Sequence, residues 1–165
     1  MRRGFGLIAV FGILLVLGLL FLAISLPCGL HSRIPANDAS ACATLRTLNA
    51  AEDTYASTYH AGFSDSLRQL GGAAEGNKPN KMAADLVDPI LSGNGPGGTA
   101  TTFTKNGFSF RYSPGPSTSG KIGAYTITAD PIARGSSGQR SFFTDKTGVI
   151  RANATDGAHA GDDPI

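Results

Sequence analysis

An uninterrupted apolar stretch at residues 4–30 constrains this chain more than any other feature. It reads GFGLIAVFGILLVLGLLFLAISLPCGL and contains no aspartate, glutamate, lysine or arginine. About 20 such residues are enough to cross the hydrocarbon core of a bilayer as one helix. We therefore expect a single membrane-spanning helix, which could serve as a cleaved export signal, a permanent anchor or an assembly helix.

The charges around this stretch predict its orientation. Arg2 and Arg3 precede it, whereas only Arg33 and the weakly basic His31 follow it closely. Because the side with more lysine and arginine stays in the cytoplasm, the N-terminus is expected inside and residues 31–165 outside. These residues are enough for one small domain.

Composition argues against nucleic acid as a partner. The net charge of the 165 residues is only +2. The basic residues are scattered along the chain, so no basic patch that could follow a phosphate backbone is predicted.

The region after residue 37 predicts a helix. Its apolar residues recur every three or four positions up to residue 59, with one charged interruption at Glu52. We expect a polar break around Pro35 before this helix, and Gly62 as its C-cap. The stripe consists of Ala41, Leu45, Leu48, Glu52, Tyr55 and Tyr59, and the candidate N-caps are Asn37, Asp38 and Ser40.

Two shorter helical segments are expected next. Residues 63–72 favour one turn of helix with Leu67 and Leu70 pointing inward, and residues 81–93 favour a helix interrupted by Pro89. The glycine pattern GxGxxG at 93–98 follows a helix-like segment rather than a strand, so we interpret it as a loop and not as a dinucleotide site.

From residue 106 the hydrophobic period changes to two, which predicts strands. Phe108, Phe110 and Tyr112 share one face, as do Tyr125, Ile127 and Ala129. Residues 140–154 read as a hairpin with its turn near Gly148. The tail at 155–165 has no period and is expected to be loose.

The predicted fold class is therefore α+β. A long apolar N-terminal helix is followed by an amphipathic helix packed on a small antiparallel sheet of three to four strands.

No catalytic, cofactor-binding or metal-ligating residues are predicted. His31, His60 and His159 have no partner at ligand or triad spacing, and no GxSxG nucleophile elbow occurs. The aspartates of the tail do not form a calcium loop of the DxDxDG type, so a solvated surface is favoured. The chain is not expected to be an enzyme.

The two cysteines leave their pairing open. One helix carrying both Cys28 and Cys42 would hold them about 21 Å apart, which is too far for a disulfide. A bridge would need a break between them, such as one at Pro35. Otherwise both thiols are small buried groups, or one pairs between chains.

The start of the chain resembles type IV pilins and the pseudopilins of type II secretion. The resemblance rests on the segment RRGFGLIAVFGILLVLGLLFLAISLP. It consists of a basic leader ending in Gly4, then Phe5, then a long apolar run. In these families a prepilin peptidase cuts after the glycine and methylates the new N-terminal phenylalanine. The resemblance implies a leader at 1–4, a transmembrane and assembly helix at 5–30, and an extracytoplasmic head at 31–165.

The resemblance extends to Leu7 and Ile8, the third and fourth residues of the implied mature chain, and then stops at Ala9. The families usually carry glutamate there, and that carboxylate pairs with the N-terminal amine of a neighbouring subunit. A lone charge in hydrocarbon is costly, so the pairing has a physical basis. The alanine is compatible with a minor subunit at a filament tip or with an uncleaved anchor.

The head also resembles the globular half of small pilin-like proteins, through GFSFRY, AYTITADP and SFFTDKTGVIRAN. The resemblance implies a non-enzymatic filament subunit of the bacterial inner membrane, with its head in the periplasm or outside the cell. Its implied partners are membrane lipid, other pilin-like subunits and the prepilin peptidase, and no cofactor is implied.

Two other classes remain open. The chain could be a single-pass, membrane-anchored binding or sensor module that does not assemble. It could also be a lipoprotein acylated at Cys28, although Pro27 before that cysteine and the length of the apolar run do not suit a lipobox.

Overall fold

The computed structural model describes residues 12–17, 33–73 and 77–165. Residues 12–17 are helical, and their side chains are exposed. In the described part of the chain, no helix combines the length and the hydropathy needed to cross a bilayer. The rest of the apolar stretch lies outside the described residues, so the predicted membrane helix stays a prediction.

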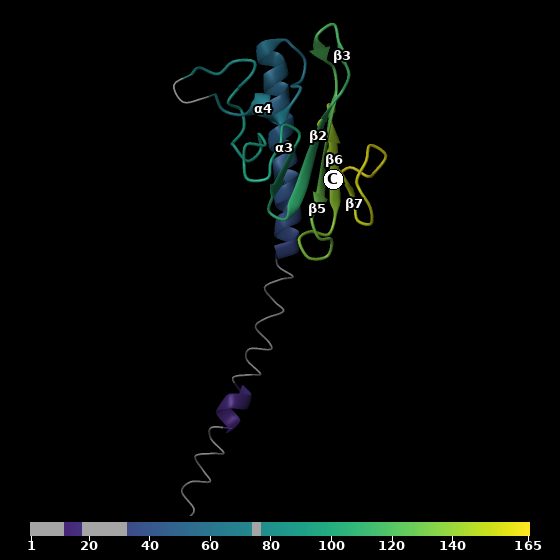
Figure 1. Cartoon of the computed structure of the whole chain (residues 1–165). Coiled ribbons are helices and arrows are strands. Elements are labelled where there is room, and N and C mark those ends of the chain that lie inside the picture. Colours follow the sequence, from purple (N-terminus) through teal and green to yellow (C-terminus); the bar gives the residue numbers. More distant parts are fainter. Residues whose placement is uncertain (1–11, 18–32, 74–76) are drawn as a thin grey trace, which may run out of the picture.

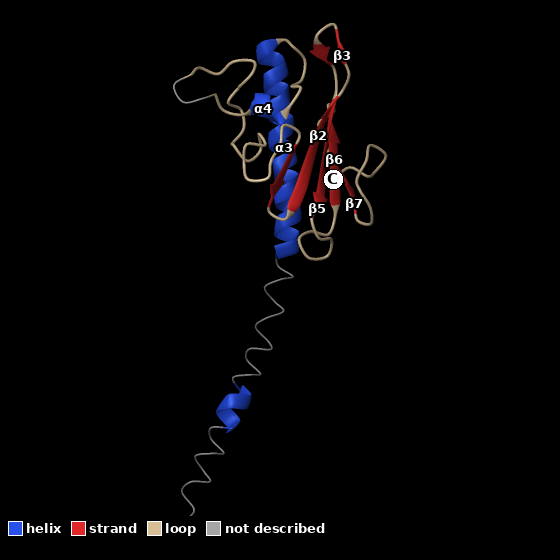
Figure 2. Cartoon of the chain, in the orientation of Figure 1, coloured by secondary structure: helices blue, strands red, loops and turns tan. Residues whose placement is uncertain are grey.

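The fold class predicted for the head is confirmed at the level of α+β. A long helix, α3 (Arg33–Tyr59), stands against an antiparallel sheet, and the short helix α4 (Leu67–Leu70) lies with its loops beside α3 (Figures 1 and 2). The strands are β1 (Thr102–Lys105), β2 (Phe108–Pro114), β5 (Tyr125–Pro131), β6 (Ser141–Asp145) and β7 (Arg151–Asn153), in the order β1-β2-β5-β6-β7. A separate hairpin consists of β3 (Ser117–Thr118) and β4 (Lys121–Ile122).

Helix α3 begins earlier than the sequence suggested. From Arg33 onward, the described helix runs through Pro35 without a break. Asn37, Asp38 and Ser40 therefore lie inside the helix and do not cap it. The break that a Cys28–Cys42 bridge would need is not present within Arg33–Tyr59, and Cys42 is buried.

The other end of α3 also differs from the prediction. The helix ends at Tyr59, and His60 takes a positive φ of 50°. Gly62, the predicted C-cap, has a φ of 78° but is used in another contact. It forms a bridge to Ile122 of β4, so it joins the chain after α3 to the β3–β4 hairpin.

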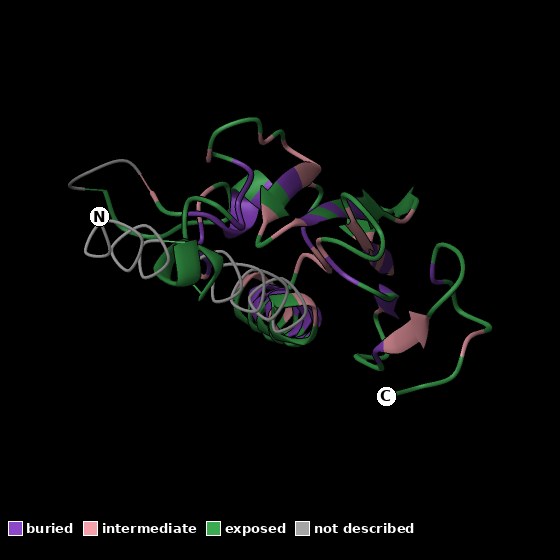
Figure 3. Ribbon diagram, turned by 90° about the horizontal axis from the view of Figure 1, so that it is seen from below, coloured by how far each residue is buried: buried purple, intermediate pink, exposed green. Residues whose placement is uncertain are grey.

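The predicted apolar stripe of α3 is the face that packs on the sheet. Ala41, Leu45, Leu48 and Tyr55 are buried, and α3 lies across β5 and β6. Figure 3, which looks along α3, shows the buried residues of the helix and of the sheet. The sheet contributes the two predicted apolar faces, namely Phe108, Phe110, Tyr112, Tyr125, Ile127 and Ala129, all buried.

The sheet is larger than predicted, with five strands among the described residues rather than three to four. The added strand is β1, which pairs with β2 through a turn at Asn106 and Gly107, both with positive φ. Asn-Gly is the preferred sequence of a two-residue hairpin turn. The Asn-Gly pair is visible in the sequence, but the short strand TFTK has only one apolar residue and therefore no alternating pattern that predicts a strand.

The helix predicted at 81–93 is wrong. The segment is a series of turns, and Ala84, Val87 and Leu91 are buried. Its backbone N–H groups donate to carbonyl oxygens at the end of α4, including Ala84 N to Gln69 O and Leu86 N to Leu70 O, both 2.8 Å. These long-range hydrogen bonds satisfy the groups that a local helix would have used. By contrast, the predicted turn of helix at 63–72 is confirmed as α4.

The C-terminal tail is packed against the sheet rather than loose. Its backbone pairs with β7 through Ala152 N to Asp163 O, 3.1 Å, and through a bridge between Arg151 and Pro164. The Arg151 guanidinium also donates to the Asp162 carbonyl oxygen at 2.7 Å. The tail therefore covers the β7 edge of the sheet, which would otherwise present unpaired backbone groups.

Candidate functional site

The sequence-predicted processing and assembly residues cannot be placed in the fold. Gly4, Phe5, Leu7, Ile8 and Ala9 all lie outside the described residues. The interpretation of these residues stays a prediction. The site that can be built from geometry lies at the C-terminal half of α3.

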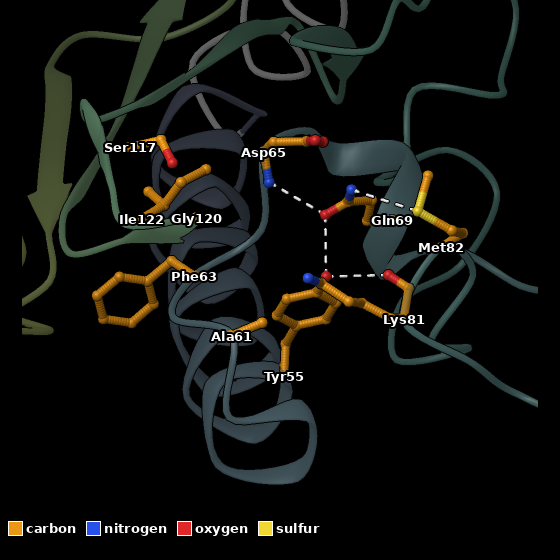
Figure 4. Close-up of a pocket in the computed structure, with 10 residues that line it drawn as sticks. All are labelled: Tyr55, Ala61, Phe63, Asp65, Gln69, Lys81, Met82, Ser117, Gly120 and Ile122. Atoms are coloured by element: carbon orange, nitrogen blue, oxygen red, sulfur yellow. Dashed lines mark hydrogen bonds between the residues drawn. The ribbon is translucent and has the colours of Figure 1, made fainter.

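A cavity of about 280 Å³ opens where α3, α4 and the β3–β4 hairpin meet (Figure 4). Gly62 and Phe63 set its shape, because Phe63 N donates to Ile122 O at 2.9 Å and fixes the hairpin against the end of α3. The lining residues are Tyr55, Ala61, Phe63, Asp65, Gln69, Lys81, Met82, Ser117, Gly120 and Ile122.

Gln69 organises the polar side of this cavity. Its Oε1 lies 3.0 Å from the Tyr55 hydroxyl and accepts from Asp65 N at 3.1 Å. The Tyr55 hydroxyl is also 2.9 Å from the Lys81 carbonyl oxygen. The single hydrogen of the Tyr55 hydroxyl therefore faces two acceptors, Gln69 Oε1 and the Lys81 carbonyl oxygen. Because Gln69 Oε1 accepts from Asp65 N, the Gln69 Nε2 is directed to the Met82 sulfur, 3.9 Å away (Figure 4). This contact is weak, and Met82 is largely exposed.

The chemistry of this cavity suits binding better than catalysis. Burial, together with the charges of Asp65 and Glu52, raises the pKa of Tyr55 to about 12, so its hydroxyl stays protonated at neutral pH. Asp65 and Lys81 are exposed and can only supply surface charge. The lining combines an apolar floor with a fixed amide donor, which is the composition of a small ligand pocket.

Beneath the loop that leaves α3 lies a buried carboxylate, Glu52, which is 0% exposed. Its Oε2 accepts from Ser64 N at 2.9 Å, and its Oε1 lies 2.6 Å from Ser64 Oγ. The Tyr112 hydroxyl donates to the Ser64 carbonyl oxygen at 2.6 Å. Burial raises the pKa of Glu52, although the hydrogen bonds from Ser64 act in the opposite direction.

A second buried polar set lies one turn away on the same face of α3. Asn49 Nδ2 donates to Thr144 Oγ1 of β6 at 2.8 Å, and the Tyr125 hydroxyl of β5 donates to Asn49 Oδ1 at 3.0 Å. Sequence analysis did not identify either set. Asn49 and Glu52 are polar residues within an amphipathic helix, and their partners are far away in the sequence.

A larger groove of about 480 Å³ lies at the opposite, N-terminal end of α3. It is lined by Ile34, Pro35 and Ala39 of the helix and by residues of the β5–β6 connection. Asp38 lies beside it, where its Oδ1 accepts from Gln139 N at 3.0 Å and its Oδ2 is 3.5 Å from Arg140 Nε. These contacts tie the start of α3 to the β5–β6 connection.

The described residues contain no cluster of histidine, cysteine, aspartate and glutamate suited to a metal ion. Comparison of the chain with protein-family models, with curated proteins and with solved structures finds no match.

Proposed function

We propose that the chain is a non-enzymatic, pilin-like or pseudopilin-like subunit of a type IV pilus or type II secretion filament. The observation that carries the proposal is the order of its parts. An apolar stretch preceded by Gly4 and Phe5 is followed by one long helix, α3, whose buried face rests on an antiparallel sheet. In this proposal α3 connects the apolar membrane segment to the antiparallel sheet of the exported head.

The exposed apolar side chains of residues 13–17 support the same proposal. They are 56–61% exposed, so none of the other described residues buries this apolar surface. Surface of this kind is stable only in lipid or against apolar neighbours. The proposed location is the bacterial inner membrane, with the N-terminus in the cytoplasm, and Ala9 favours a minor or tip subunit.

The first prediction concerns processing at Gly4. When the chain is co-expressed with a prepilin peptidase, we expect its intact mass to fall by residues 1–4 and to rise by one methyl group on Phe5. Gly4→Val should prevent the cut, because a branched side chain replaces the small residue at the scissile bond. Gly6→Val is the matched control, and it should leave the cut in place. Intact-mass spectrometry of the membrane fraction distinguishes these species.

A full-length mass under these conditions would contradict the proposal. It would favour the second candidate, a single-pass anchored binding module, which the cavity beside Gln69 supports. Ala9→Glu provides an independent check, since restoring the carboxylate should increase the fraction of the protein recovered in sheared filaments. No increase would show that Ala9 does not limit assembly.

A further inference from the structure

Glu52 is an unusual residue to find at the centre of a helix–sheet interface. It is 0% exposed and lies in the C-terminal half of α3. Among the described residues, the ion pairs are Arg140 with Asp38 and His159 with Asp162, and neither involves Glu52. Burying a carboxylate without a cation is expensive, so the protein must either compensate the charge or remove it.

The hydrogen bonds around Glu52 form a short chain of oxygen atoms. Glu52 Oε1 lies 2.6 Å from Ser64 Oγ, and Ser64 Oγ lies 3.2 Å from the Tyr112 hydroxyl. The Tyr112 hydroxyl in turn lies 2.6 Å from the Ser64 carbonyl oxygen. There are three contacts, and each needs one hydrogen atom.

Counting those hydrogens indicates the protonation state. A carbonyl oxygen only accepts, so the single hydrogen of Tyr112 is used on the Ser64 carbonyl. The contact between Tyr112 and Ser64 Oγ then requires the single hydrogen of the serine. Consequently the contact between Ser64 Oγ and Glu52 Oε1 has a hydrogen only when Glu52 is a neutral acid. With an ionised Glu52, one of the two contacts made by Ser64 Oγ has none.

Burial, the largest effect, and the charge of Asp53 oppose the ionisation of Glu52 and raise its pKa, whereas the hydrogen bonds from Ser64 and Tyr112 favour the ionised form. The titratable side chains whose charge acts with that of Glu52 are Asp53 and Tyr55 of α3, Tyr112 of β2 and Tyr125 of β5. The loop after α3 adds Asp65 next to Ser64. None of these side chains is a cation, so among the described residues no opposite charge compensates an ionised Glu52.

We propose that Glu52 is held in the folded head as a neutral carboxylic acid, and that its proton closes a latch joining α3 to residues 63–65 and to β2. In this state Glu52 Oε1 donates to Ser64 Oγ, Ser64 Oγ donates to Tyr112, and Tyr112 donates to the Ser64 carbonyl. Loss of the proton breaks the chain at Ser64 Oγ. The loop at 63–65 borders the cavity beside Gln69, so the latch controls the wall of that cavity.

The sign of the pH dependence follows. Because burial raises the pKa of Glu52 above its ordinary value of 4.5, the folded head binds the proton more tightly than the unfolded chain. The bound proton contributes fully to the free energy of unfolding below pH 4.5. This contribution is lost as the pH rises through the pKa that Glu52 has in the folded head, and at higher pH no further change is expected from Glu52.

The titration of Glu52 can be measured directly, because the sequence contains only two glutamates, Glu52 and Glu75. In the full chain in detergent micelles, Glu75→Gln leaves one glutamate, whose carboxyl carbon can be labelled with 13C and followed by NMR. We expect the midpoint to lie above the ordinary glutamate value of 4.5, because burial raises the pKa of Glu52. A midpoint at or below that ordinary value overturns the proposal. If Glu75→Gln disturbs folding, the wild-type chain serves, since one of its two signals must then titrate above the ordinary value.

A second experiment uses Glu52→Gln, which mimics the neutral acid. The glutamine amide can donate to Ser64 Oγ while its oxygen accepts from Ser64 N, so the latch stays closed at every pH. Between about pH 4.5 and pH 8, we expect the Tm of the wild type to fall relative to that of Glu52→Gln. Asp163→Asn is the matched control, because it removes the same charge from an exposed residue of the tail that does not act on the pKa of Glu52, and it should keep the wild-type decline. Parallel profiles for the wild type and Glu52→Gln would overturn the proposal.

Discussion

Phe108→Ala lowers the free energy of unfolding of the head by about 3–5 kcal/mol, the largest effect we expect from one substitution. Phe108 is 0% exposed and lies at the start of β2. Its ring centroid is 6.5 Å from that of Phe110 and 5.9 Å from that of Phe142. On the other side the ring reaches Gly138, where a β-carbon would come within 2.6 Å of Phe108 Cε2.

The packing around Phe108 leaves little room for relaxation. Gly138 already brings backbone against the ring, so removal of the ring leaves a cavity that neighbouring side chains cannot easily fill. Unfolding of the full chain in detergent can be followed by far-UV circular dichroism, since the sequence has no tryptophan. Ser109→Ala, at the next and exposed position, is the control and should change stability by less than about 0.5 kcal/mol. Similar losses for the two variants would show that Phe108 is not part of the core.

The second large effect is expected for Gly62→Ala, which should destabilise the head by about 2–4 kcal/mol. Gly62 has a φ of 78°, and a β-carbon there would collide with the backbone oxygen of Ile122 and lie 2.9 Å from its nitrogen. The substitution therefore adds backbone strain and also forces the β3–β4 hairpin away from the end of α3. The cavity beside Gln69 would lose the wall that the hairpin provides.

Gly120→Ala is the matched control for Gly62→Ala. Gly120 has a φ of 77° but has no atom within 4 Å of its added β-carbon, so only the conformational cost of about 1–2 kcal/mol applies. Hydrogen exchange at the Phe63 amide, which donates to Ile122 O, reports on the docking of the hairpin. We expect faster exchange in Gly62→Ala and not in Gly120→Ala. Equal rates in both variants would contradict the docking role of Gly62.

Features with a local hydrophobic period were predicted correctly from the sequence, whereas features that depend on distant contacts were not. Local periodicity correctly identified the apolar stripe of α3 and the alternating faces of β2 and β5, because a face buried along a whole element leaves a repeated signature. Strand β1 was missed although Asn106 and Gly107 marked its turn. The predicted helix at 81–93 failed because Ala84 N and Leu86 N donate to carbonyl oxygens at the C-terminal end of α4 and not to a preceding turn of their own segment.

The candidate site was not predictable in the same way. Glu52 is the one charged interruption of the predicted apolar stripe, and the structure buries it fully. Ser64, which contacts Glu52, lies 12 residues further along the chain, and Tyr112, which contacts Ser64, lies another 48 residues on. No local pattern contains that information.

The sequence by itself determined which residues belong to a membrane-like stretch, which face of α3 is apolar and which residues alternate along the strands. These features depend on hydrophobicity and on the helix and strand periods, which are local. Only the tertiary structure decided that Gly62 meets Ile122, that the tail covers β7 and that a carboxyl group sits inside the core. Those outcomes depend on contacts between distant segments, because a buried polar group is tolerated only where the fold brings it partners.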